Sequence, residues 1–251
     1  IERPIMKNEW AYLRQCHRLA HLQVISTNPT ISPFDILFEV ASDCLDRLQT
    51  LVINHPRNGM SDSAVTVLGK SLKHFTQLTT LDIECPGYVF PNLAPYIPDL
   101  IALQHLTLKN LNMKTRLNDG MPSMVSNLSM LTQLTHLCLD DLANGRGAAC
   151  VKGLCQIISS LSHLTALLLP ATYFNPKSIV IICEYISQLS GLTHLDLSSS
   201  TLDEASVNVL GKMVRSLPIL HLELGDIEWE SGGLESLFTQ FDDWSQLKSL
   251  N

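Results

Sequence analysis

The chain has 251 residues, of which 45% are hydrophobic and 16% charged, and its formal net charge is −7 at pH 7. This length suits one large domain or two small ones, and no apolar run is long enough to cross a membrane. Electrostatic binding to nucleic acid relies on clustered Lys and Arg, which are not seen here. We therefore expect neither a nucleic acid nor a membrane as a partner.

A short motif with apolar residues at positions 1, 4 and 6 recurs along the chain. It begins at residues 19, 48, 78, 103, 134, 164, 192 and 219, and a partial copy begins at 247. Successive starts lie 25 to 31 residues apart, which predicts a repeat architecture. Each motif is expected to form a short strand, with positions 4 and 6 in the core and positions 3 and 5 on the opposite face.

Between the motifs, apolar residues recur at helical spacing. This pattern is clear in residues 151–161, 182–189 and 207–217, and each of these segments is predicted to be a helix. Asp203 lies just before the third segment and is a predicted N-cap. Pro91, Pro95 and Pro98 follow the motif that begins at 78, and they predict short turns there instead of a long helix.

The fold that follows is a curved α/β solenoid. A single strand and helix cannot bury both apolar faces, whereas stacked units share one core. Strands need about 4.8 Å per neighbour and helices nearly twice that, so the parallel strands should line the concave face and the helices the convex face. We expect residues 1–251 to form a single domain of about eight repeats.

The LxxLxL motif and the repeat length resemble the leucine-rich-repeat family, and the helical segments are similar to its ribonuclease-inhibitor-like class. The resemblance implies a right-handed horseshoe. The family usually has Asn or Cys at position 9, whereas this chain has Thr27, Pro56, Pro86, Leu111, Leu142, Thr172, Ser200 and Ile227 there. In unit length and helix content the chain resembles the repeat regions of nucleotide-binding (NOD-like) immune receptors, which implies a role in innate immune sensing. It has no GxxxxGK[ST] phosphate loop, and we expect no cofactor.

The cysteines indicate a reducing compartment. There are seven, an odd number, and none forms a CxxC pair. Free thiols are therefore expected, which favours a cytoplasmic location.

Position 3 of the motif holds five of the nine histidines of the chain, namely His21, His105, His136, His194 and His221. Two pairs, His105 with His136 and His194 with His221, come from adjacent repeats. Because neighbouring strands lie about 4.8 Å apart, each pair should be in side-chain contact on the open face.

Position 5 adds Asp196 and Glu223 beside the second pair. This group permits two interpretations. It contacts a protein partner, or it binds a divalent metal or performs acid–base catalysis. The catalytic and metal-binding candidates are the same four residues, His194, Asp196, His221 and Glu223. We favour partner binding, because an open solenoid face offers no enclosed pocket for catalysis.

Two further arrangements are less favoured. Ser198 to Ser200 follow the same motif, but the sequence has no GxSxG turn to direct a serine nucleophile towards His194 and Asp196. A soft metal at His105, His136 and Cys138 would need a fourth ligand, which the sequence does not supply.

The loops that follow two of the strands carry acidic and aromatic residues near the predicted rim. They contain Asp140, Asp141, Asp226, Glu228 and Trp229. Trp229 is the aromatic residue expected to contact a partner, and the alternative is that it folds back over the last helix. The predicted partner-binding residues are His105, His136, Asp140, His194, Asp196, His221, Glu223 and Trp229.

The sequence thus predicts a protein-recognition module, which binds a protein ligand or another domain of the same polypeptide through its concave face. The alternative is a hydrolase or metal-binding protein that uses the His194 group. We lean towards a chain that is not an enzyme.

Overall fold

The structure is a computed structural model that describes residues 16, 18–25, 46–54, 62–84, 90–111, 117–142, 147–240 and 244–251. Its main feature is one parallel sheet of nine strands, which neighbour one another in chain order. The strands are β1 (His21–Ile25), β2 (Thr50–Asn54), β3 (Thr80–Glu84), β4 (His105–Lys109), β5 (His136–Leu139), β6 (Ala166–Leu168), β7 (His194–Asp196), β9 (His221–Glu223) and β11 (Ser249–Leu250). Each falls on a predicted motif.

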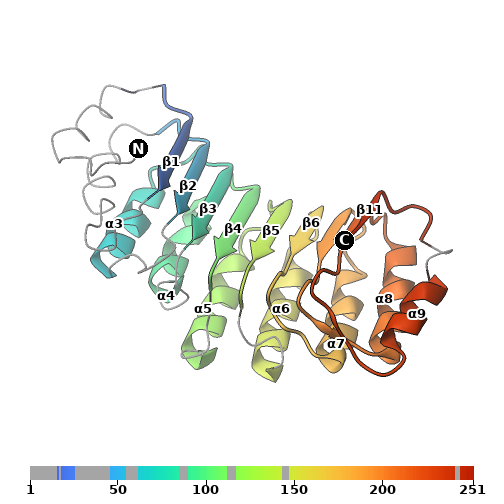
Figure 1. The fold of residues 1–251 in the computed structure, drawn as a ribbon. Coiled ribbons are helices and arrows are strands. Elements are labelled where there is room, and N and C mark those ends of the chain that lie inside the picture. Colours follow the sequence, from blue (N-terminus) through green and yellow to red (C-terminus); the bar gives the residue numbers. More distant parts are fainter. Residues whose placement is uncertain are drawn as a thin grey trace.

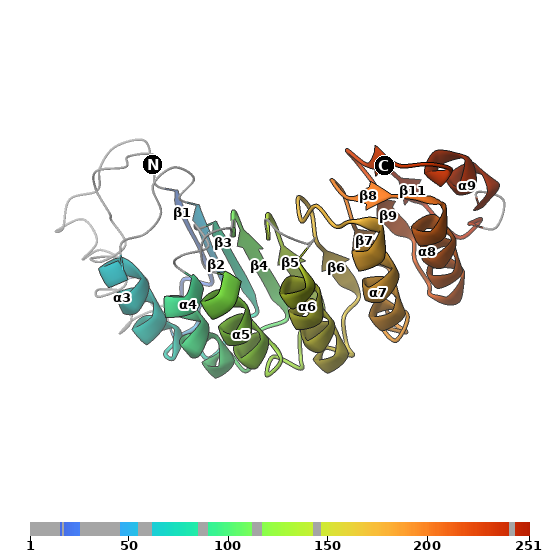
Figure 2. The same ribbon diagram turned by 90° about the horizontal axis from the view of Figure 1, so that it is seen from below.

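Helical segments follow most of the strands. They are α3 (Asp62–Leu72), α4 (Phe90–Leu93), the 3-10 helix η2 (Ala94–Asp99), α5 (Leu117–Leu128), α6 (Ala148–Ser160), α7 (Pro176–Ile186), α8 (Glu204–Ser216) and α9 (Gly233–Gln240). Figures 1 and 2 show the helices side by side along one face of the sheet, with β1 and β11 at opposite ends of an arc. The strands line the inside of this arc, so the predicted right-handed solenoid with a concave sheet and convex helices is confirmed.

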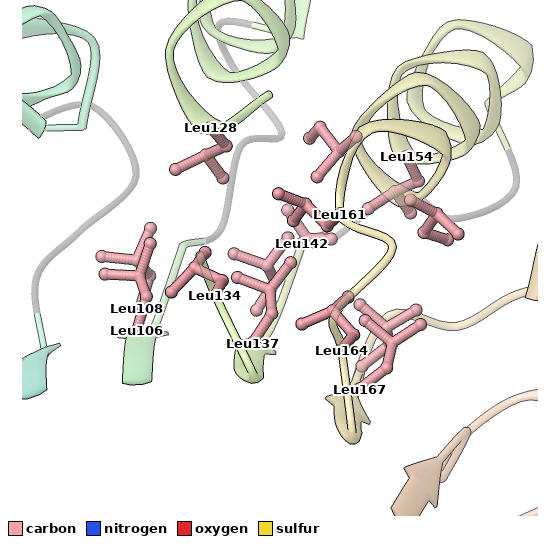
Figure 3. Packing of buried hydrophobic residues seen from close by; sticks show 14 of the residues in the cluster. Leu106, Leu108, Leu128, Leu134, Leu137, Leu142, Leu154, Leu161, Leu164 and Leu167 are labelled. Atoms are coloured by element: carbon pink, nitrogen blue, oxygen red, sulfur yellow. The ribbon is translucent and has the colours of Figure 1, made fainter. Parts of the chain in front are cut away.

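The core lies between the sheet and the helices. The burial of β2, β3 and β4 alternates, with positions 4 and 6 buried and positions 3, 5 and 7 partly exposed. Leu106, Leu137 and Leu167 are at most 1% exposed. Figure 3 shows these strand leucines on the side of the sheet that faces helices α5 and α6, which carry Leu128 and Leu154, with other leucines between the two layers. The leucine period and the helical stripes thus pack into one shared core.

The helix ends and interruptions follow local chemistry. Asp203 caps α8: its carboxylate accepts from the backbone N–H of Ser206 at 2.8 Å, and the Ser206 side chain accepts from the Asp203 N–H. Burial raises the pKa of Asp203, but the hydrogen bonds from Ser206 outweigh this, so the pKa is lowered. In the proline-containing repeat, α4 has only four residues and η2 continues as a 3-10 helix. Both predictions are confirmed.

Five successive strands, β4 to β7 and β9, are followed by a turn with a left-handed residue that the motif did not predict. Position 8 has a positive φ angle in five successive repeats, at Asn110, Asp141, Ala171, Ser199 and Asp226. Asn and Asp tolerate this left-handed conformation better than most residues. The turn directs position 9 inward, and Leu111, Leu142, Thr172 and Ser200 are buried there. An apolar or small residue therefore fills the place where the family usually has Asn or Cys.

A second, two-stranded parallel sheet lies beyond β7 and β9. It pairs β8 (Thr201–Leu202) with β10 (Glu228–Trp229). This sheet extends the hydrogen bonding between the last repeats past their turns, which the repeat pattern did not indicate. That residues 1–251 form a single domain stays a prediction, since parts such as residues 1–15 and 26–45 lie outside the described residues.

Candidate functional site

The concave face is arranged in rows that cross the strands. The register aligns His105 with His136, His136 with Ala166, Ala166 with His194 and His194 with His221. His21 belongs to the same row, in register with Thr50 of β2. The five histidines of position 3 therefore share one row, as their position in the motif predicted.

Both predicted histidine pairs are stacked. The ring centroids of His105 and His136 lie 4.0 Å apart with an interplanar angle of 17°. Those of His194 and His221 lie 4.3 Å apart at 18°. Ala166 lies between the two pairs in this row, so its methyl group separates the two stacks.

Threonines at position 2 orient two of these rings. Thr193 donates its hydroxyl to the carbonyl oxygen of Thr165 at 3.0 Å, and its oxygen lies 2.8 Å from Nδ1 of His194. A hydroxyl has one proton, so we assign the proton of this contact to Nδ1 of His194. Thr135 does the same for His136, with distances of 3.2 Å to the Gln104 carbonyl and 2.8 Å to Nδ1. Nε2 of each ring is then the nitrogen that titrates.

Protonation of these rings is disfavoured. Burial lowers the pKa of His136, and the neighbouring His105 and His194 lower it further. Burial and the adjacent His221 also lower the pKa of His194, against a smaller opposing effect of Glu223. The rings are therefore mainly neutral at pH 7, and they gain charge only as the pH falls below the usual histidine range.

Asp196 does not expose its side chain on the concave face beside Glu223, although the motif predicted this. It is in register with Glu223, but it is only 8% exposed, and its Oδ1 accepts from the backbone N–H of Ser198 at 2.8 Å. Its carboxylate thus closes the turn after β7, while Glu223 is exposed. The ring of His194 is held by Thr193 instead of Asp196, so the geometry does not provide the orienting pair that a Ser-His-Asp triad needs.

The described residues contain no group of three or more His, Cys, Asp or Glu side chains placed to hold a metal ion. Cys138 follows His136 on the concave face, and burial, followed by the charge of Asp140, raises its pKa to about 12. Cys138 is therefore a protonated thiol at neutral pH and a weak metal ligand. No observation in this part of the chain favours the hydrolase or metal-binding alternative.

Four of the described cysteines are free thiols, namely Cys138, Cys150, Cys155 and Cys183. Burial raises the pKa of Cys150 and Cys183 to about 12 and that of Cys155 to about 11, so these three thiols behave as buried apolar groups. Within the described ranges, none of the helices is both long and apolar enough to cross a membrane.

The charge of the concave face is mainly negative. At positions 3, 5 and 7 of the described strands and turns, Asp82, Glu84, Asp140 and Glu223 are partly or fully exposed, and Lys109 is the cationic residue. Lys109 donates to Asp82 at 2.9 Å. Burial alone would lower the pKa of Lys109, but this hydrogen bond and the charge of Asp82 outweigh it, and the pKa is raised. Lys109 is thus already paired, and the other exposed carboxylates remain available to cations.

Asp140 is partly buried and lies next to another acid. Burial raises its pKa, and the adjacent charge of Asp141 raises it further, with a partial offset by Lys109. Placing a cation near Asp140 would therefore relieve both desolvation and like-charge repulsion.

Trp229 packs partly against the core. It is of intermediate exposure in β10, paired with Leu202 of β8. Glu228 is exposed, and its carboxylate accepts from Thr201 at 3.2 Å. The partner-binding role of Trp229 stays a prediction. An exposed aromatic residue that the sequence reasoning missed is Tyr173, at 47%, in the loop between β6 and α7.

The buried leucine ladder, the parallel concave sheet and the convex helices together define a leucine-rich-repeat-like solenoid. No family model matches the chain, and no curated protein matches it either. Solved structures do match, including the crystal structure of a TLR13–ssRNA13 complex. That match has 15% sequence identity and a TM-score of 0.44, and it covers 95% of this chain and 39% of that chain. A likeness at this level concerns the fold alone.

The expectation that nucleic acid is not a partner is corrected: the matched structure is a complex with ssRNA, which is a property of that protein, and the exclusion for this chain rested on composition alone. The reasoning behind the expectation was wrong in physical terms as well. A net charge of −7 is a sum over the whole chain, whereas binding depends on the residues of one face. Composition therefore does not exclude a nucleic acid partner.

Proposed function

We propose that the chain is a recognition module whose concave face binds a positively charged segment of a protein ligand or of another domain of the same polypeptide. The observation that carries the proposal is the charge of that face. Exposed carboxylates recur across it, and the one lysine at the described concave positions is paired with Asp82. Complementary charge favours encounter with a basic segment and fixes its register.

The geometry suits an extended partner. The nine strands of the sheet present their side chains at regular spacing, so many modest contacts add up over a large curved surface. The stacked histidines contribute polar surface beside the acids. His105, His136, Asp140, His194, His221 and Glu223 are proposed contact residues, and Asp196 supports them by holding the turn after β7.

The setting of this function is also part of the proposal. The unit length and helical segments support the ribonuclease-inhibitor-like class and a similarity to NOD-like receptors. In that setting the chain would work inside the cell, in innate immune sensing.

Fluorescence anisotropy with a short labelled peptide rich in Lys and Arg tests the proposal. We expect this peptide to bind, and its counterpart with Glu in place of Lys and Arg to fail. Asp140→Asn combined with Glu223→Gln should weaken binding about threefold to tenfold, as expected for two partly exposed charge pairs. Glu184→Gln is the matched control, because Glu184 is exposed on the convex helix α7.

A labelled single-stranded RNA forms the second arm of this experiment. If RNA binds more tightly than the basic peptide and the concave variants change its affinity, nucleic acid is the partner and the proposal is wrong. Binding of neither probe also contradicts it.

A further inference from the structure

Strand β6 interrupts the polar surface of the concave face. Its outward positions 3 and 5 are Ala166 and Leu168, and Pro170 follows at position 7. The adjacent strand β5 has His136 and Cys138 in register with Ala166 and Leu168. One repeat thus presents an apolar stripe, while the repeats on either side present polar groups.

The first residue of this stripe lies between two imidazole rings. Ala166 is in register with both His136 and His194, and it is only 4% exposed although it faces the concave side. The strands on either side lie about 4.8 Å away. The low exposure of Ala166 shows that side chains around it cover the methyl group, so the exposed part of the stripe begins at Leu168.

Tyr173 extends the apolar surface into the loop from β6 to α7. It is 47% exposed and has a φ angle of 56°, and Ala171 in the same loop has a φ angle of 49°. Non-glycine residues in this region are strained and persist only when the surrounding structure fixes them. The neighbouring residues Thr172 and Phe174 are buried, which holds the backbone in this conformation and leaves the ring of Tyr173 in solvent.

Exposed carboxylates lie on both sides of the stripe, next to it after β5 and one strand further away on β9. Asp140 and Asp141 follow β5, and the Asp141 N–H donates to the Pro170 carbonyl at 3.2 Å, which places this acidic turn beside the stripe. On the other side, Glu223 of β9 is exposed and lies next to β7 in the sheet. A ligand that covers the stripe therefore meets negative charge at both ends.

We propose that Leu168, Pro170 and Tyr173 form the apolar centre of the concave binding face, which takes a protein segment with one apolar side chain flanked by Lys or Arg. The inference rests on the proposed function and specifies its partner. Interfaces place a buried apolar centre inside a polar rim, and aromatic residues near that centre contribute most of the affinity. The apolar side chain would lie on Leu168, and the flanking cations would face Asp140 and Glu223.

Two basic peptides that differ at one position test this inference. Both are rich in Lys and Arg, and the central residue is Leu in one and Ser in the other. The unaltered chain should bind the Leu peptide at least about fivefold more tightly. Leu168→Ala and Tyr173→Ala should each reduce this preference to near unity and leave the affinity for the Ser peptide unchanged.

Ile181→Ala is the control, because Ile181 is 44% exposed on the convex helix α7, and it should retain the preference. Equal binding of the two peptides by the unaltered chain overturns the inference and leaves the proposed function standing. A preference that survives both Leu168→Ala and Tyr173→Ala also overturns it. If neither peptide binds, the proposed function fails, and this inference with it. The comparison of peptides needs no variant and therefore does not depend on how the variants fold.

Discussion

Leu167 and Leu168 are neighbours on β6 that face opposite sides of the sheet, so truncating each one tests which side is the core. Leu167 is 0% exposed and lies between Leu137 and Leu195 of the adjacent strands, each 1% exposed. Leu168 is half-buried on the concave face. The two substitutions change the same atoms in opposite environments.

Leu167→Ala should lower the free energy of unfolding by about 3 to 5 kcal/mol, because ladder hydrogen bonds hold both neighbouring strands and prevent them from closing the cavity. Leu168→Ala loses only part of the transfer free energy of one leucine and leaves no enclosed cavity, so we expect a loss of about 1 kcal/mol.

Urea unfolding followed by far-ultraviolet circular dichroism measures both values under identical conditions. The unaltered chain and both variants are compared at one protein concentration. A loss for Leu168→Ala that equals or exceeds the loss for Leu167→Ala would refute the assignment of the two faces of the sheet.

Four further predictions follow from individual contacts. Asp203→Ala should destabilise the chain by about 1 kcal/mol through loss of the α8 cap, measured by the same urea titration, and no change would contradict the capping role. The pKa values of His136 and His194 are lowered in the folded chain, so the unfolded state binds more protons as the pH falls through 6.5, the usual histidine value. The free energy of unfolding is therefore highest above pH 6.5 and decreases as the pH falls. The double variant with Gln at both positions should flatten this part of the stability–pH curve, and an unchanged slope would argue against the shifts. Gly69→Ala should destabilise the chain by about 1 kcal/mol, although alanine has the better helix propensity, because the added Cβ would overlap the ring of Tyr96 in η2. Thermal unfolding measures this change, and a stabilised variant would contradict the contact. Elemental analysis of the purified chain should find no stoichiometric zinc, whereas one zinc per chain lost with His194→Ala would support the metal-binding alternative.

The leucine period was sufficient to predict the strands, their order and the side that each strand residue faces. The prediction was correct because strand side chains alternate between two faces and helix side chains repeat about every 3.6 residues. Only one arrangement of the strands and helices buries all the apolar residues of both. The same argument placed His105 beside His136 and His194 beside His221. Row membership follows directly from the motif position in any stacked repeat.

The sequence reasoning did not predict where Asp196 directs its carboxylate. Its side chain can face solvent beside Glu223 or bond to a nearby backbone N–H, and the Ser198 amide lies two residues away. Short acidic side chains often form such local bonds, and which one wins depends on the turn geometry. That geometry is set by the left-handed residue Ser199, which the motif does not specify.

The apolar stripe on β6 was also overlooked, although its residues are visible in the sequence. The motif places Leu168 at position 5, on the open face, but the sequence analysis did not group it with Ala166 and did not assign Pro170 to that face. A row-by-row comparison of neighbouring repeats, with position 7 included, would have found the stripe. The left-handed turn that exposes Tyr173 could not have been found in this way, because Ala171 and Tyr173 are not residues that favour a positive φ angle.

Photo-crosslinking of a basic peptide is the most direct test of the central claim that the concave face is the binding surface. The peptide carries a photoreactive leucine analogue at its centre, and mass spectrometry locates the adducts on the chain. The account predicts adducts on β5, β6 and β7 and on the loop that contains Tyr173. Adducts that concentrate on the convex helices α5, α6 and α7 would contradict it.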